Sequence, residues 1–291
     1  MTYLLQQVLN AAQLGSIYAL IALGYTMVYG ILTMINFAHG DLFMVGAFFC
    51  FLTATFLKLP FIPTLLVSML GVALLGVAIE RVAYKPLRQA PRVSAIITAL
   101  GVGLFLENFT LVFSPYPQHV PTLIENKTWT LGGVSISSLQ IIIILLSIAM
   151  MVMLDFIVQR TKVGMAMRAI SWDKNIVPLM GVPVDLIISA TFALGTSLGA
   201  AAGVMYALAF PVIDPYMGIM VGWKAFISAV VGGIGNIRGA MIGGFILGAV
   251  EILVAAFLPS TYRDFVAFGL LLILLIFRPY GILGKPRPQK V

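Results

Sequence analysis

Charged side chains are scarce in this 291-residue chain. Asp, Glu, Lys and Arg make up 9% of the residues, and hydrophobic residues make up 61%. Soluble domains contain about 25% charged residues, and a soluble core of this size would need a polar cover that this chain cannot supply. The composition therefore excludes a soluble globular protein and predicts a membrane protein.

Cysteine and histidine are also rare. The single cysteine, Cys50, excludes an internal disulfide and a cysteine-based metal cluster, and we expect it to be a small buried side chain. His39 has no metal-binding companion, because His119 is the only other histidine. The sequence also shows no Ser/His/Asp constellation and no paired-carboxylate site. We therefore predict a protein without catalytic residues, metal or cofactor, in which energy for pumping comes from an ion gradient or a separate ATPase.

The net charge of +7 is unevenly distributed. Residues 1–40 carry no charge, whereas a secretory signal needs a basic start, so we expect a mature N-terminal segment. The basic residues form three patches: Arg81, Lys85, Arg88 and Arg92; Arg160, Lys162, Arg168 and Lys174; Arg278, Lys285, Arg287 and Lys290. Segments rich in Lys and Arg stay in the cytoplasm. The charge thus indicates topology and contact with anionic lipid headgroups, not nucleic-acid binding.

Hydrophobic segments alternate with these patches and predict an all-α, polytopic transmembrane bundle of about 8–10 spans, some broken or short, in a single domain, residues 1–291. The segments are 8–33, 42–57, 61–80, 93–114, 139–157, 186–210, 219–235, 239–258 and 264–278. Nine spans would place all three patches and the C-terminus in the cytoplasm, with the N-terminus and residues 115–138 outside. Several segments are short for a bilayer core, and segments 42–57 and 219–235 could be partly re-entrant, which would change the side of the N-terminus.

A polar stretch, RTKVGMAMRAISWDKNIVPLMGVPVD, interrupts this apolar chain between two long uncharged flanks. We expect a cytoplasmic coupling loop over about residues 158–185. A short helix is predicted from Ser171, as its cap, to Gly181, its stop. Its apolar face would contain Trp172, Ile176, Leu179 and Met180. This helix lies either on the bilayer surface or in a groove of a cytosolic subunit.

Polar residues within or beside the apolar segments mark a candidate translocation path or hinge, because such groups should face a cavity or a partner. They are Asn36, His39, Gly40, Asp41, Glu107, Asn236, Gly239 and Glu251. At residues 35–41, Gly40 permits a turn and Asn36 or Asp41 can cap a helix; the alternatives are a broken helix beside the path or a short loop. We do not expect His39 to contact substrate directly, and Glu107 and Glu251 could instead be hydrated near a membrane edge.

Two further patterns have competing interpretations. The breaks from Asn36 to Gly40 and from Asn236 to Gly239 form a weak internal repeat, as in many transporters, or simply reflect glycines that let membrane helices pack closely. The sequence GGIGNIRG at 232–239 lacks the GK[ST] of a nucleotide loop, so its glycines predict tight helix packing. Trp223 and Lys224, at the start of an apolar run, are interpreted as interfacial anchors.

Four stretches together resemble a known family. They are GSIYALIALGYTMVYGILTMINFAHGDLFMVGAF (15–48), TKVGMAMRAISWDKNIVPLMGV (161–182), GWKAFISAVVGGIGNIRGAMIGG (222–244) and FRPYGILG (277–284). They resemble the high-affinity branched-chain amino acid permeases of bacterial ABC transporters, specifically LivH-type subunits. The resemblance maps the family's ATPase-coupling segment onto Gly164, Arg168, Ala169, Asp173 and Gly181. One departure is the Gly235-Asn-Ile-Arg-Gly239 stretch, where the family pattern is Gly-Ser-Ile-Pro-Gly.

The resemblance implies a multi-pass permease subunit of the bacterial inner membrane that transports leucine, isoleucine or valine. Its implied partners are a second, LivM-type permease, two cytoplasmic ATPases and a periplasmic substrate-binding protein. Three alternatives stay open at this point. They are a urea or short-chain amide permease, an ion-coupled secondary amino acid carrier, and a membrane scaffold without transport activity.

Overall fold

The computed structural model describes residues 2–32, 34–174 and 176–284, so that Lys285, Arg287 and Lys290 of the third basic patch lie outside the described residues. Each of the nine apolar segments is a helix. The helices are α1 (Thr2–Leu32), α2 (His39–Thr55), α3 (Phe61–Ile79), α4 (Arg92–Phe113), α5 (Ser138–Arg160), α7 (Val184–Ala209), α8 (Met217–Gly232), α9 (Ile237–Phe257) and α10 (Tyr262–Phe277). A shorter helix, α6 (Lys162–Trp172), lies in the polar stretch. The predicted polytopic all-α fold is confirmed.

The apolar helices fall into two length classes. Six helical segments are long and apolar enough to cross a membrane; they span 2–32, 61–87, 93–113, 138–160, 184–209 and 237–257. Helices α2, α8 and α10 have 17, 16 and 16 residues, fewer than the roughly 20 that cross a hydrocarbon core. Helices α2 and α8 are the two segments for which a re-entrant course was considered from the sequence, and they pack against each other.

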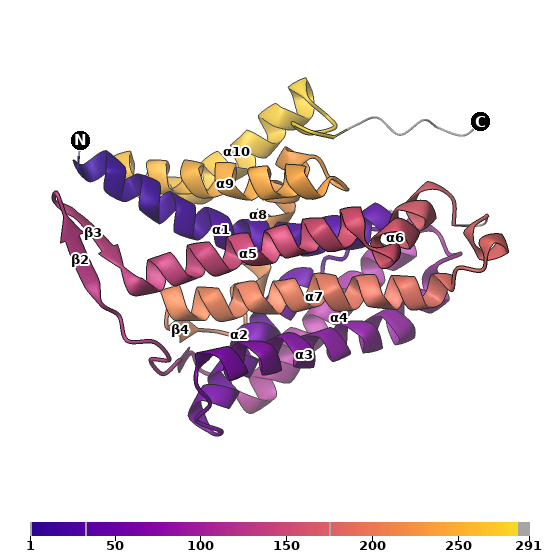
Figure 1. Ribbon diagram of the computed structural model, residues 1–291, viewed down its shortest axis with the longest axis horizontal. Helices are drawn as coiled ribbons and strands as arrows, with labels where there is room; N and C mark the ends of the chain where they lie inside the picture. Colours follow the sequence, from indigo (N-terminus) through magenta and orange to yellow (C-terminus); the bar gives the residue numbers. More distant parts are fainter. Residues whose placement is uncertain (1, 33, 175, 285–291) are drawn as a thin grey trace.

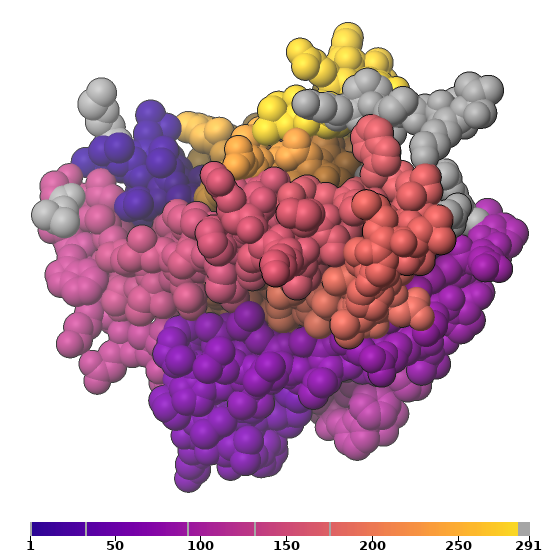
Figure 2. All heavy atoms as spheres, turned by 45° about the vertical axis from the view of Figure 1, so that its right-hand side comes forward, coloured from indigo at the N-terminus to yellow at the C-terminus, as the bar shows by residue number. Residues whose placement is uncertain are grey.

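Helices α1, α2 and α7 form the centre, and α3, α4, α5 and α10 cover it with largely exposed apolar side chains. Small residues allow the central helices to approach closely. A Cβ added to Gly46 of α2 would lie 2.5 Å from the Cα of Ala200 in α7, and Gly244 of α9 packs just as tightly on Ala19 of α1. Helix α7 packs between α3 and α5 (Figure 1), and the side chains of these helices form a continuous face on this side of the bundle (Figure 2). Cys50 is buried, as predicted.

The two ends of the bundle along its long axis carry different elements (Figure 1). One end has the antiparallel hairpin of β2 (Thr128–Leu131) and β3 (Val134–Ser137), together with the pairing of β1 (Gln118–His119) and β4 (Val212–Ile213). The hairpin is fastened to the start of α1, where Gln6 exchanges two hydrogen bonds with the backbone of Ser135.

The opposite end gathers the basic patches. A π-helical turn, η1 (Glu80–Tyr84), and a 3₁₀ turn, η2 (Lys85–Leu87), follow α3 there. Lys85 and Arg88 of the first patch form ion pairs with Asp185 at the start of α7. Asp185 follows the second patch in the chain, so these ion pairs link the two patches. Residues 278–284, which begin with Arg278 of the third patch, are hydrogen-bonded to the end of α8. The Ile282 N–H donates to the Val231 carbonyl at 2.9 Å. The predicted clustering of the patches at one end therefore holds for their described residues.

The helix predicted from Ser171 to Gly181 is wrong in position. Helix α6 begins ten residues earlier, where the Thr161 side chain accepts a hydrogen bond from the Gly164 N–H, 3.1 Å. Ser171 lies in its last turn, and its hydroxyl donates to the Arg168 carbonyl. Pro178 cannot donate a backbone hydrogen bond, and only a 3₁₀ turn, η3 (Val177–Met180), forms around it. Gly181 does end that turn, with φ +76°.

Candidate functional site: an acidic cavity between short helices

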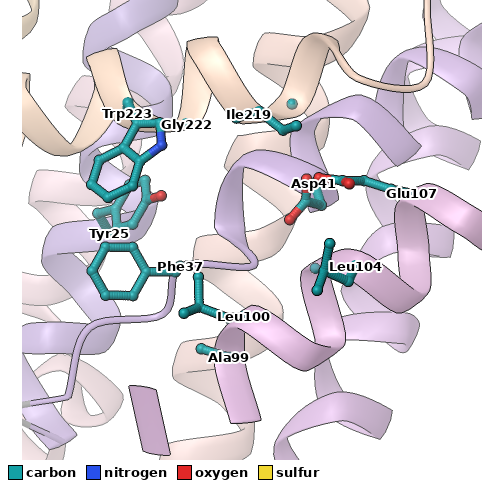
Figure 3. Close-up of a pocket in the computed structure, with 12 residues that line it drawn as sticks. Tyr25, Phe37, Asp41, Ala99, Leu100, Leu104, Glu107, Ile219, Gly222 and Trp223 are labelled. Atoms are coloured by element: carbon teal, nitrogen blue, oxygen red, sulfur yellow. The ribbon is translucent and has the colours of Figure 1, made fainter. Parts of the chain in front are cut away.

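A cavity of about 190 Å³ lies between α1, α2, α4 and α8 (Figure 3). It is bounded mainly by apolar and aromatic side chains, with two carboxylic acids. The lining residues are Tyr25, Phe37, Asp41, Ala99, Leu100, Gly103, Leu104, Glu107, Gly218, Ile219, Gly222 and Trp223. Its volume is below the roughly 300–1,000 Å³ of drug-sized pockets. The cavity therefore suits a small ligand.

The starts of the two short helices create this cavity. The chain turns back after α1 and begins α2 at His39, whose ring contacts Tyr25 of α1 at a centroid distance of 4.9 Å. In the first turn of α2, Gly40 packs directly on α8: a Cβ added to Gly40 would lie 2.6 Å from the Cα of Gly222. Gly218 of α8 touches the same turn. Glycine at these positions lets α2 and α8 approach closely. The cavity is the space beside this contact between α2 and α8.

Asp41 and Glu107 are the acids of the cavity, and each is 6% exposed. Figure 3 shows their carboxyl groups pointing toward one another from α2 and α4. The Asp41 carboxylate sits between two glycines, Gly103 of α4 and Gly218 of α8, and its Oδ1 would be 2.8 Å from a Cβ at Gly218. This oxygen has no hydrogen-bond partner among the described residues. The expectation that the chain has no paired-carboxylate site is therefore wrong.

An aromatic group closes the other side of the cavity. The rings of Phe37 and Trp223 are 5.5 Å apart, and Phe226 contacts Tyr25, Phe37 and Trp223 at centroid distances of 5.9–6.3 Å. With Leu100 of α4, these rings form an apolar wall next to the acids. The sequence analysis missed Tyr25, Phe37 and Leu100, because an aromatic or leucine in an apolar segment carries no local sign that it faces a cavity.

Asn36 and His39 flank the cavity without lining it. Asn36 Oδ1 accepts a 2.6 Å hydrogen bond from the Tyr84 hydroxyl of η1, so the side chain holds the end of α3 against the turn before α2. The residue before α2 is Ala38, and no side chain caps the helix. The predicted capping by Asn36 or Asp41 is therefore wrong. His39 is fully buried, with its ring against Gly24 of α1 and Gly199 of α7.

Glu251 lies in a separate ion cluster. It accepts hydrogen bonds from Lys224 and from the Tyr18 hydroxyl, 3.1 Å, and Lys224 also pairs with Asp264 at 2.9 Å. This cluster joins α1, α8, α9 and α10. The interpretation of Lys224 as an interfacial anchor is wrong, because its side chain is 14% exposed and its charge is held by two carboxylates. Its neighbour Trp223 lines the cavity instead. Two adjacent residues of α8 thus belong to different sites, Trp223 to the cavity and Lys224 to the ion cluster.

Asn236 caps α9 after the turn from α8, and Gly239 lies in the first turn of α9. The Asn236 side chain accepts from the Gly239 N–H, 3.1 Å, and donates to the Leu283 carbonyl, 2.8 Å. Gly239 lies against the backbone of Gly232, which confirms the predicted close packing of this glycine-rich stretch. Arg238, the departure from the family pattern, pairs with Asp155 of α5 at 3.2 Å. These residues lie apart from the cavity.

The predicted coupling residues organise the segment around α6. Gly164 packs on the carbonyl of Val158 in α5, where a Cβ would collide, and Arg168 donates to that same carbonyl. Ala169 accepts the Asp173 N–H at the end of α6, and Gly181 ends η3. The four residues of the predicted apolar face point outward: Trp172, Ile176, Leu179 and Met180 are 76%, 53%, 86% and 76% exposed. The inner side of the segment buries Met167, Ile170 and Val177. The described residues of the segment, 158–174 and 176–185, thus form a platform with an apolar outer surface.

The six long apolar helical segments define the chain as a multi-pass membrane protein. A family model described as "Branched-chain amino acid transport system / permease component" matches residues 7–275. The chain is 42% identical to the high-affinity branched-chain amino acid transport system permease protein LivH of Escherichia coli K12, over 99% of this chain and 98% of that protein. It is 40% identical, with the same coverage, to the permease protein BraD of Pseudomonas aeruginosa, and 27% identical to a probable LivH of Methanocaldococcus jannaschii over 93% and 89%. The chain belongs to this family of branched-chain amino acid transport permeases.

Proposed function

We propose that this chain is the inner-membrane permease subunit of an ABC importer and carries leucine, isoleucine or valine across the membrane. The similarity to high-affinity branched-chain amino acid permeases over nearly the whole chain carries the proposal. The proposed complex contains a LivM-type permease, two cytoplasmic ATPases and a periplasmic binding protein. The whole chain acts as one permease domain, and ATP is hydrolysed on the partner subunits.

The coupling platform, residues 158–185, would transmit the ATPase movement into the bundle. Helix α6 contacts α1, α5 and α7, so a force on its outer surface reaches two central helices. Asp185 at the start of α7 is also tied to Lys85 and Arg88, which links the platform to the end of α3. Because α1 contributes Tyr25 to the cavity, a displacement of α6 would alter the cavity as alternating access requires.

Uptake by the reconstituted complex tests this function. The permease is co-purified with its native partner subunits, placed in proteoliposomes with ATP inside, and given radioactive leucine together with the binding protein. We expect uptake that needs ATP and is competed by isoleucine and valine. Leucine uptake by this chain alone, driven by an ion gradient, would instead establish a secondary carrier, and uptake of urea without competition by leucine would establish an amide permease.

A further inference from the structure

The cavity holds two acids and no base. Among the described residues that line it, Asp41 and Glu107 are the only ones that carry a formal charge. The nearby Lys224, next to the lining residue Trp223, is already engaged by Glu251 and Asp264. Two facing carboxylates in a low-dielectric interior repel one another strongly. The Asp41 and Glu107 side chains are in hydrogen-bond contact, so a shared proton, or a cation bound beside the pair, is needed to offset the repulsion.

Asp41 is also poised to accept a hydrogen bond. Its Oδ1 is buried against Gly218 and has no partner among the described residues, and the Asp41 side chain lines the cavity together with Glu107 (Figure 3). A buried carboxylate oxygen without a donor is costly. An ammonium group offers three donors and one positive charge, so it would pair with the two acids where they line the cavity and offset the repulsion between them.

The rest of the cavity is unsuited to a bare ion. Phe37, Leu100 and Trp223 present an apolar wall next to the acids, and a hydrated metal ion would gain nothing from that surface. A hydrocarbon side chain attached close to an ammonium group would bury against it. The face of an aromatic ring also attracts a cation within about 6 Å.

We propose that this cavity is a substrate-binding site within the permease, in which Asp41 and Glu107 bind the α-ammonium group of an apolar amino acid. The amino acid side chain packs against Phe37, Leu100 and Trp223. This inference rests on the proposed transport function and adds a site to it: the permease itself recognises the cargo after delivery. Asp41 and Glu107 then discriminate against molecules that have the same hydrocarbon part but lack the positive charge.

Equilibrium binding of tritiated leucine to the complete membrane complex in nanodiscs, without the binding protein, tests this site. Two competitors separate the contributions: leucinol keeps the ammonium group and the side chain, and 4-methylpentanoate keeps the side chain and lacks the ammonium group. We expect leucinol to displace leucine and 4-methylpentanoate to fail at concentrations about 100-fold higher. Asp41→Asn and Glu107→Gln should each weaken leucine binding about tenfold or more.

Matched controls separate this effect from misfolding. Asp155→Asn removes a carboxylate that pairs with Arg238 away from the cavity, so it should bind leucine like the wild type. Asp41→Glu keeps the charge and should retain more affinity than Asp41→Asn. If the Asp41 variants do not assemble, the competitor series on the wild-type complex and the Glu107→Gln variant decide the matter.

Three results would overturn the inference. They are equal displacement by both competitors, wild-type affinity in Asp41→Asn and Glu107→Gln, and saturable binding of sodium or potassium ions that leucine does not displace. ATP-driven leucine uptake by the wild-type complex is measured in parallel. Its presence, together with any of these three results, rejects only the cavity site, whereas its absence rejects the proposed function.

Discussion

Asp41 of α2 and Glu107 of α4 bring their carboxyl groups together at the wall of one cavity, although they lie on helices that are not consecutive in the chain. Each residue was a candidate on its own from the sequence, because ionisable groups in membrane segments are costly. Their pairing depends on Gly103 and Gly218, which leave room for the Asp41 carboxylate between α4 and α8. The structure therefore converts two isolated candidates into one acidic site.

Labelling with a membrane-impermeant maleimide tests the predicted topology. Cys50, the only native cysteine, is buried and should give little background. Trp129→Cys, in the β2–β3 hairpin, should be labelled in spheroplasts, in which the outer membrane is opened. Leu179→Cys, in the coupling platform, should be labelled only after the inner membrane is permeabilised. The reverse pattern would place the platform outside and contradict its coupling to a cytoplasmic ATPase.

Gly181→Val should uncouple transport from ATP hydrolysis. Gly181 has φ +76°, a conformation that costs a β-branched residue about 1–2 kcal/mol, so the turn after η3 would rearrange and shift the apolar outer surface. We expect leucine uptake to fall about tenfold while ATPase activity of the complex persists. Gly269→Ala in α10, where a Cβ meets nothing within 4 Å, is the control, and coupled uptake at the wild-type level in Gly181→Val would count against the platform.

Lys224→Met should destabilise the bundle by about 3–5 kcal/mol, because it leaves Glu251 buried without its cation. Thermal unfolding of the detergent-solubilised protein, followed by size-exclusion chromatography, measures the loss. The double variant Lys224→Met, Glu251→Gln should recover much of it, since the unpaired buried charge is gone.

A milder change tests the same cluster. Tyr18→Phe removes one hydrogen bond to Glu251 and should cost about 1 kcal/mol. A double variant of Lys224 and Glu251 that is no more stable than Lys224→Met would show that the two side chains are not energetically coupled.

Gly40→Val should separate α2 from α8 and reduce leucine uptake. The added Cβ would meet the Gly222 backbone, which has no side chain that could move aside. Overpacking of this kind costs about 1–3 kcal/mol, and here it also displaces Asp41, the next residue. Uptake at saturating leucine, compared with that of the Gly269→Ala control, is the measurement. Wild-type uptake would show that the α2–α8 contact is dispensable.

The sequence by itself determined which segments form the apolar helices. Hydrophobicity along residues such as 239–258 and the uncharged flanks of the polar stretch are local properties, and they predicted every apolar helix. Gly181 as a stop and the close packing of Gly232 and Gly239 were also predicted, because a left-handed turn or a close backbone approach favours glycine. The resemblance to the permease family was visible in short contiguous motifs for the same reason.

Tertiary structure alone decided which polar groups meet. It paired Asn36 with Tyr84, Lys224 with Glu251 and Asp264, and Asp41 with Glu107. It also set the start of α6 at Thr161, where Gly164 packs on α5. These contacts depend on the rotation and depth of each helix against its neighbours, which are fixed by small residues packing across helices that are distant in the chain. A residue's hydropathy contains no information on that register.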